Sequence, residues 1–134
     1  MNIIEKIASE EGFSARMYKC PADKWTIGYG FNLEALDMPQ AVAELWLSIL
    51  VKDIKQSLYV LGWTGGLNEA RRLAVTDMAY QLGVRGLCRF VKMAMALSAK
   101  DYETAANELL DSEYARQTPA RAKRNADIIR SGEI

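Results

Sequence analysis

The sequence contains no histidine, and this absence excludes several kinds of catalytic site. Without an imidazole there is no Cys/His zinc site and no Ser-His-Asp or Cys-His triad. Only two cysteines are present, Cys20 and Cys88, and their spacing does not require a disulfide. Because Cys88 lies in the apolar stretch "GLCRF", we expect it to be a buried free thiol. The sequence therefore predicts neither a metal ion nor a cofactor.

The chain also lacks net charge, because 17 Lys and Arg residues balance 17 Asp and Glu residues. No overall positive field favours nucleic-acid binding. The charge is nevertheless uneven between residues 114 and 130, where five basic residues face one acidic residue: Arg116, Arg121, Lys123, Arg124, Arg130 and Asp127. Such a run is typical of a solvated surface, although it can also bind an acidic polymer.

Long hydrophobic runs are missing as well. No segment reaches the length of a membrane span, and residues 1–15 have no basic region followed by an apolar one. We therefore expect no stable membrane insertion and a start in the cytoplasm. With 134 residues, half of them hydrophobic, the chain can form one domain with a stable core.

Residues 3–11 are predicted to form a helix. Asn2 and Glu5 have the spacing of a capping box, and Gly12 is a natural stop. Ile4, Ile7 and Glu11 follow the spacing of one helical face, so we expect the Glu11 side chain to point inward.

The next residues change period, and the aromatic and β-branched runs around "PAD" predict a hairpin within residues 16–30. Helical spacing predicts a long helix over 40–59, broken by "GWTGG", and further helices near 68–82, 87–97, 102–114 and 121–130. The predicted fold class is α+β, mainly α, in one domain of residues 1–134. Its small lobe spans about 12–38, the connecting helix about 40–59, and the helical lobe about 63–134 together with helix 3–11.

Glu11 is the first candidate for chemistry. It lies in the last helical turn, where the helix dipole and burial both favour a protonated carboxyl. A carboxylic acid kept neutral near pH 7 can act as a general acid. The alternative is that Glu11 pairs with a basic residue and only closes the helix.

Cys20 and Thr26 follow on the two arms of the hairpin. If the loop consists of the three residues 21–23, both side chains share one face of the ribbon, whereas a four-residue loop separates them. Basic neighbours can lower the pKa of the Cys20 thiol. The alternatives are structural, with Cys20 as a small hydrophobe at a strand end and Thr26 as an ordinary strand residue.

The spacing of Glu11, Cys20 and Thr26, followed by "IGYG", resembles the catalytic signature of phage-type lysozymes, the muramidases of glycoside hydrolase family 24. The segments "ARRLAVTDMAYQLGVRGLCRF" and "QTPARAKR" resemble the C-terminal lobe of that family, in the same order. The resemblance covers most of the chain and implies a lysozyme-like two-lobe fold.

The resemblance also implies roles for these residues. Glu11 would protonate the glycosidic oxygen, while Cys20 and Thr26 would activate and hold the attacking water on the opposite face. Such enzymes invert the anomeric centre, and inversion needs about 6.5–9.5 Å between the two groups. The thiol could instead attack carbon, with retention, although water activation is favoured. The matching substrate-binding positions are Gly30, Tyr80, Gln81, Thr118 and Arg121, with Arg121 contacting the catalytic glutamate. Phe31 departs from the histidine frequent at its position, so we expect apolar packing there.

The implied function is a peptidoglycan hydrolase, an endolysin that cuts the β-1,4 bond between N-acetylmuramic acid and N-acetylglucosamine. We expect a monomer that stays in the host bacterial cytoplasm until a holin gives it access to the cell wall. The basic run would then face an anionic wall. Two alternatives remain: a lytic transglycosylase that uses Glu11 alone, and a non-catalytic wall-binding module. An aromatic face such as Tyr80 suits a sugar, but core packing explains it equally well.

Overall fold

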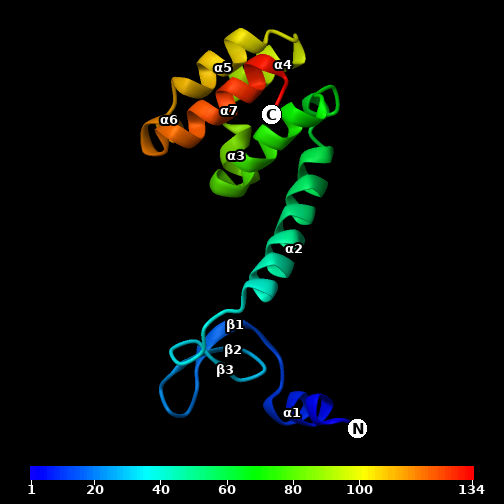
Figure 1. Cartoon of the computed structure of the whole chain (residues 1–134), viewed down its shortest axis with the longest axis vertical. Coiled ribbons are helices and arrows are strands. Elements are labelled where there is room, and N and C mark those ends of the chain that lie inside the picture. Colours follow the sequence, from blue (N-terminus) through cyan, green and yellow to red (C-terminus); the bar gives the residue numbers. More distant parts are fainter. The chain divides into compact units, whose positions relative to one another are not determined.

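The computed structural model describes all 134 residues, and Figure 1 labels its helices and strands along the chain. The chain divides into two compact units, Met1–Glu44 and Leu45–Ile134, each described here by itself. A small three-stranded antiparallel sheet near the N-terminus is combined with a helical remainder, which confirms the α+β, mainly α, fold class. None of the helices is both long and apolar enough to cross a membrane.

Helix α1 (Ile3–Glu11) has the predicted bounds and the predicted capping box. The Asn2 Oδ1 atom accepts a hydrogen bond from the Glu5 backbone N–H, and Glu5 Oε2 accepts one from the Asn2 N–H, both at 2.9 Å. Gly12 ends the helix with φ of 70°. The inward position expected for Glu11 is wrong in this structure, because α1 has no buried residue and Ile4 is 72% exposed. Helical periodicity identified an apolar stripe but not a partner that covers it.

The sheet of the first unit contains β1 (Ser14–Lys19), β2 (Trp25–Gly28) and β3 (Phe31–Asn32) in that order. The predicted hairpin is β1–β2, in which Tyr18 pairs with Thr26 and Lys19 with Trp25. Its loop is therefore the three residues 21–23, and Asp23 takes the positive φ of 61° typical of such loops. Strand β3 was not predicted, since two residues are too few to show a period.

Helix α2 (Gln40–Tyr59) matches the predicted long helix in both bounds, and the division between the two units falls within it. The short 3₁₀ helix η1 (Gly62–Thr64) follows in the predicted break. The buried Thr64 hydroxyl lies 2.7 Å from the Leu58 carbonyl oxygen and 2.9 Å from that of Leu61. Both carbonyl oxygens also accept backbone N–H groups, that of Leu58 from Leu61 and that of Leu61 from Thr64, so the hydroxyl adds a further contact to the turn that follows α2.

The second unit continues with α3 (Glu69–Cys88), α4 (Val91–Ser98), α5 (Tyr102–Leu110), α6 (Glu113–Gln117) and α7 (Pro119–Ser131). The predicted helix 68–82 stops where α3 bends, at Gly83 with φ of 76°, but α3 continues past the bend. The predicted helix 102–114 is wrong, because it is two helices. Ser112 separates them by accepting a hydrogen bond from the Ala115 N–H as the N-cap of α6.

The core of the second unit is built from small and medium apolar side chains. Its largest fully buried members are Met78, Leu87, Met93, Leu109 and Ile129. Buried alanines on α3, α5 and α7 let these helices approach closely, and α5 lies beside α7 (Figure 1). The expectation that Cys88 is buried is wrong, since its thiol is exposed. Leu87, the preceding residue of α3, fills the core instead, which turns Cys88 outward.

Candidate active site

Glu11 and Gly30 are in contact within the first unit. The Glu11 carboxylate lies against the backbone of Gly30, so closely that a Cβ atom on residue 30 would be 2.8 Å from Glu11 Cδ. Gly30 also has φ of 72°, a conformation that disfavours residues with side chains. The positive φ favours glycine here, and a Cβ atom at residue 30 would also require the Glu11 side chain to move.

Cys20 and Thr26 lie on one face of the hairpin, as expected for a three-residue loop. The Thr26 side chain is 3% exposed, and its hydroxyl is 2.9 Å from the Lys24 carbonyl oxygen. The pKa of the Cys20 thiol is lowered, chiefly because the Lys24 backbone N–H hydrogen-bonds to sulfur. The Ala22 N–H and the Thr26 hydroxyl act in the same direction, while partial burial acts against them. This setting makes the Cys20 thiol more acidic than that of an ordinary cysteine, with a lower pKa.

Two aromatic residues flank Gly30 in the sequence, Tyr29 and Phe31, and Tyr29 also contacts Phe13 between α1 and β1. The rings of Phe13 and Tyr29 are 5.5 Å apart between centroids, and those of Tyr29 and Phe31 are 6.4 Å apart in an edge-to-face arrangement. Phe31 also lies against Gly28, where an added Cβ would be 2.8 Å from its ring. The apolar packing expected of Phe31 in place of a histidine is therefore present, although the ring remains 49% exposed.

Tyr80, Gln81 and Thr118 lie in the second unit. Tyr80 is 46% exposed, so packing in the core does not account for it. The Gln81 Nε2 atom lies 3.4 Å from Thr118 Oγ1, and the Thr118 hydroxyl donates to the Tyr114 carbonyl oxygen at 3.0 Å. The structure thus places an aromatic ring and a side-chain amide on α3 and a hydroxyl at the start of α7.

Arg121 makes a two-pronged ion pair with Asp77 of α3. Its Nε donates to Asp77 Oδ2 at 2.9 Å and its Nη2 to Oδ1 at 2.6 Å. These hydrogen bonds lower the pKa of Asp77 and raise that of Arg121, and the Tyr80 hydroxyl is another group near enough to raise the Arg121 pKa. Arg121 therefore stays charged beside the exposed aromatic ring.

The Asp77 carboxylate also accepts a hydrogen bond from a buried residue of the helical core. The Asn125 Nδ2 atom donates to Asp77 Oδ2 at 2.8 Å and to the Tyr114 hydroxyl at 2.9 Å. Asn125 is 4% exposed and Tyr114 3% exposed. Burial raises the pKa of Tyr114, so the phenol is neutral over the working range of pH.

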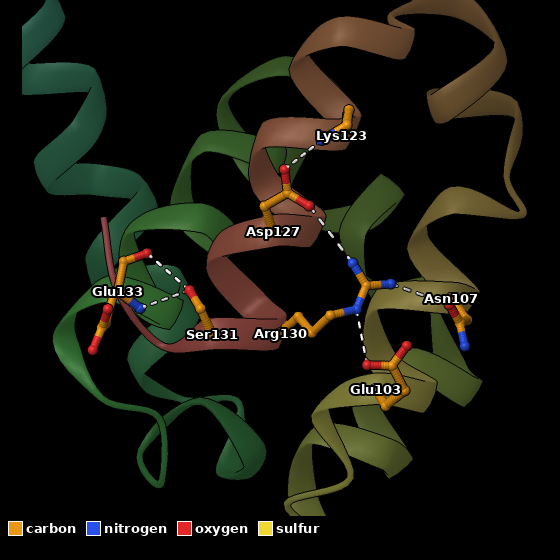
Figure 2. Close-up of polar contacts among 7 residues, drawn as sticks. All are labelled: Glu103, Asn107, Lys123, Asp127, Arg130, Ser131 and Glu133. Atoms are coloured by element: carbon orange, nitrogen blue, oxygen red, sulfur yellow. Dashed lines mark hydrogen bonds and ion pairs between the residues drawn. The ribbon is translucent and has the colours of Figure 1, made fainter.

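Most of the basic run at residues 116–130 is paired with carboxylates. Figure 2 shows Arg130 of α7 bound to Glu103 of α5, with Nε–Oε2 of 2.9 Å, and to Asp127, which also pairs with Lys123. Arg116 pairs with Glu113 and Arg121 with Asp77, whereas Arg124 has no carboxylate within 4.0 Å. Four of the five basic side chains are therefore paired, two of them with carboxylates of α3 and α5, which weakens the expectation of a wall-binding basic surface.

The predicted site residues thus fall into two sets. Glu11, Cys20, Thr26 and Gly30 lie in the first unit, and Tyr80, Gln81, Thr118 and Arg121 lie in the second. Each set contains direct contacts between its own members.

Sequence analysis missed Asp77 and Asn125. The spacing contained a signal for Asp77, which precedes Tyr80 by three residues and Gln81 by four, so that all three share one face of α3. No such local signal exists for Asn125, because its partners come from α3 and α6.

Comparisons with known proteins identify a family for the chain. A family model described as phage lysozyme matches residues 8–126. The pre-baseplate central spike protein Gp5 of Enterobacteria phage T4 is 35% identical over 88 residues, which are 66% of this chain and 15% of that protein. Two proteins of Dictyostelium discoideum also match. Probable T4-type lysozyme 1 is 27% identical over 81% of this chain and 68% of its own length, and probable T4-type lysozyme 2 is 26% identical over 65% and 51%. The chain therefore spans a small part of the spike protein and about half of the second amoebal protein.

Proposed function

Because the chain belongs to the phage lysozyme family, we propose that it hydrolyses peptidoglycan, with Glu11 as the general acid. The bond cut is the β-1,4 linkage between N-acetylmuramic acid and N-acetylglucosamine. The observation that carries the proposal is the contact between the Glu11 carboxylate and the backbone of Gly30. This contact places the exposed Glu11 carboxyl beside the turn between β2 and β3, where a leaving-group oxygen can reach it.

The acid step transfers the Glu11 proton to the glycosidic oxygen as the bond from the anomeric carbon breaks. The sugar on the far side leaves with a hydroxyl group, and positive charge develops on the anomeric carbon and ring oxygen. The glutamate becomes a carboxylate, which is reprotonated from solvent because the side chain is exposed.

The water step uses Cys20 with Thr26. The Cys20 thiolate takes a proton from a water molecule while the water oxygen bonds to the anomeric carbon. The lowered pKa of the thiol supplies more thiolate than an ordinary cysteine would at the same pH. Thr26 lies on the same face of the hairpin as Cys20, and in this proposal it helps to hold the attacking water.

Residues of the second unit supply substrate contacts in this proposal. The Gln81 amide nitrogen is directed to Thr118, which leaves the amide oxygen free to accept from an N-acetyl N–H. The exposed face of Tyr80 suits an apolar sugar surface. Arg121, charged and fixed by Asp77, can bind an acidic or carbonyl oxygen.

The experiment is a digestion of purified peptidoglycan with analysis of its products. Loss of turbidity with release of reducing ends, and hydrated disaccharide products in the mass spectrum, is the expected result. Products with 1,6-anhydro ends would show that the protein is a lytic transglycosylase and not a hydrolase. Binding to peptidoglycan without any cleavage would overturn the enzymatic proposal in favour of a wall-binding module.

A further inference from the structure

We propose that Asp77 is a positioning residue for substrate binding. It orients the Arg121 guanidinium so that the guanidinium can donate to an acceptor group of the glycan. The inference rests on the proposed function. It assigns Asp77 a role that its charge does not predict, because an acidic residue would not be expected to help bind an acidic polymer.

The first argument is the geometry of the pair. A guanidinium held through both Nε and Nη2 has its plane and its direction fixed, whereas a single contact would leave it free to rotate. Two of its five N–H groups are used by Asp77, and three remain for another partner. Arg121 is 35% exposed, so these remaining donors can reach a ligand.

The second argument is that Asp77 itself is held. Its Oδ2 atom accepts from both Arg121 and Asn125, and the second amide hydrogen of Asn125 is occupied by the Tyr114 hydroxyl. Both supporting residues are buried in the helical core. The position of the guanidinium is thereby set by the core of the unit rather than by flexible surface side chains.

The third argument comes from a comparison within α7. Arg130 donates to Glu103 at 2.9 Å and to Asn107 at 3.3 Å, as Figure 2 shows, and none of the predicted substrate-binding residues is among its hydrogen-bond or ion-pair partners. Arg121 instead follows Thr118 by one helical turn, and its partner Asp77 precedes Tyr80 by one turn on α3. Each ion pair ties α7 to another helix, so Glu103, which is more exposed than Asp77, provides a control for a purely structural role.

The test compares Asp77→Ala, Asp77→Asn, Arg121→Ala, the double variant Asp77→Ala/Arg121→Ala, and Glu103→Ala. For each, kcat and KM are measured on soluble peptidoglycan fragments, and the melting temperature is recorded. Binding of an N-acetylglucosamine–N-acetylmuramic acid oligosaccharide is measured in a Glu11→Gln background, where it is not cut. The ¹⁵N signal of Arg121 Nε–H reports the position of the guanidinium directly.

We expect Asp77→Ala to lower kcat/KM about 100-fold, the scale for misplacing a group that orients substrate. Asp77→Asn keeps one acceptor oxygen, so its kcat/KM should lie between those of Asp77→Ala and the wild type. The loss of kcat/KM in the double variant should be no larger than that in Arg121→Ala, because Asp77 acts only through Arg121. The Arg121 Nε–H signal should shift on adding oligosaccharide in the wild type and lose that response in Asp77→Ala. Glu103→Ala should lower the melting temperature but leave kcat/KM and the signal unchanged.

The proposal is overturned if Asp77→Ala and Glu103→Ala lower kcat/KM by the same factor. It is also overturned if the loss of kcat/KM in the double variant is the full combination of the losses in Asp77→Ala and Arg121→Ala. If the wild type binds the oligosaccharide but cleaves nothing, hydrolysis fails as the function, while the response of the Arg121 signal still decides the role of Asp77. A wild-type Arg121 signal that ignores bound oligosaccharide would refute the positioning role even in an active enzyme.

Discussion

The carboxylate of Glu11 lies against Gly30, where a Cβ atom would come within 2.8 Å of Glu11 Cδ. The two residues belong to different segments, since Glu11 ends α1 and Gly30 lies in the turn between β2 and β3. This contact joins the first helix to the sheet at the carboxyl group proposed to do the chemistry. The absence of a side chain at Gly30 therefore leaves room for the Glu11 carboxylate at this position.

Replacing Gly30 by alanine should abolish peptidoglycan cleavage, because the new methyl group displaces the Glu11 carboxylate. Gly83→Ala is the matched control, since Gly83 also has positive φ but no atom within 4 Å of an added Cβ. Both substitutions strain the backbone, at a cost of about 1–3 kcal/mol in the free energy of unfolding. Cleavage rates and denaturant unfolding of both variants separate the two effects. Equal activity of the two variants would contradict the role of the contact.

Alkylation of Cys20 should inactivate the protein. The Cys88→Ser variant leaves Cys20 as the single thiol, and Cys20→Ser/Cys88→Ser is the unreactive control. Because the pKa of Cys20 is lowered, its reaction with iodoacetamide should become fast at a lower pH than that of a cysteine in an unstructured peptide. Full activity of a completely alkylated protein, verified by mass spectrometry, would remove Cys20 from the mechanism.

Cys20→Asp should retain cleavage at neutral pH. An aspartate is ionised well below pH 7, with an ordinary pKa of about 3.9, and can take the proton of the attacking water as a thiolate does. The stereochemistry of the product, followed by NMR immediately after cleavage, should be inverted for both proteins. A large loss of activity in Cys20→Asp, together with retention in the wild type, would instead indicate a covalent bond to sulfur.

The stabilising effect of Asp77 should depend on pH. Its pKa is lower in the folded protein, chiefly through the Arg121 hydrogen bonds, so the unfolded chain takes up a proton first as pH falls. The extra stability of the wild type over Asp77→Ala is then complete above the unfolded pKa of about 3.9 and is lost as pH falls through the lower folded value.

At neutral pH we expect this difference to be about 1–2 kcal/mol, reduced from that of a fully buried pair because both side chains are about one-third exposed. Urea unfolding between pH 2.5 and 7 measures it. A difference that stays constant over this range would show that lost packing, and not the ion pair, destabilises the variant.

Local features of the fold could be predicted from the sequence because their causes are local. The Asn2–Glu5 capping box, the Gly12 stop and the bounds of α2 depend on neighbouring residues and were predicted correctly. The helix 102–114 was mispredicted because apolar spacing continues across Ser112, where a side-chain cap starts a new helix. Strand β3 forms only because β2 is already beside it, which no local pattern shows.

In the candidate site, too, local features could be predicted from the sequence and contacts between distant segments could not. The hairpin loop length decides that Cys20 and Thr26 share a face, and the sequence left that length open until the register was known. The role of Gly30 beside Glu11 and the pairing of Arg121 with Asp77 both depend on segments distant in sequence. Such contacts follow from tertiary packing, which periodicity does not encode.

Glu11 is tested most directly by comparing Glu11→Gln with Glu10→Gln on purified peptidoglycan. The neighbouring Glu10 is exposed and pairs with Lys6, so its amide variant controls for the loss of one negative charge at the end of α1. The account predicts that Glu11→Gln releases no reducing ends while keeping the wild-type circular dichroism spectrum, and that Glu10→Gln cleaves at the wild-type rate. Cleavage by a folded Glu11→Gln protein at an undiminished rate would contradict it.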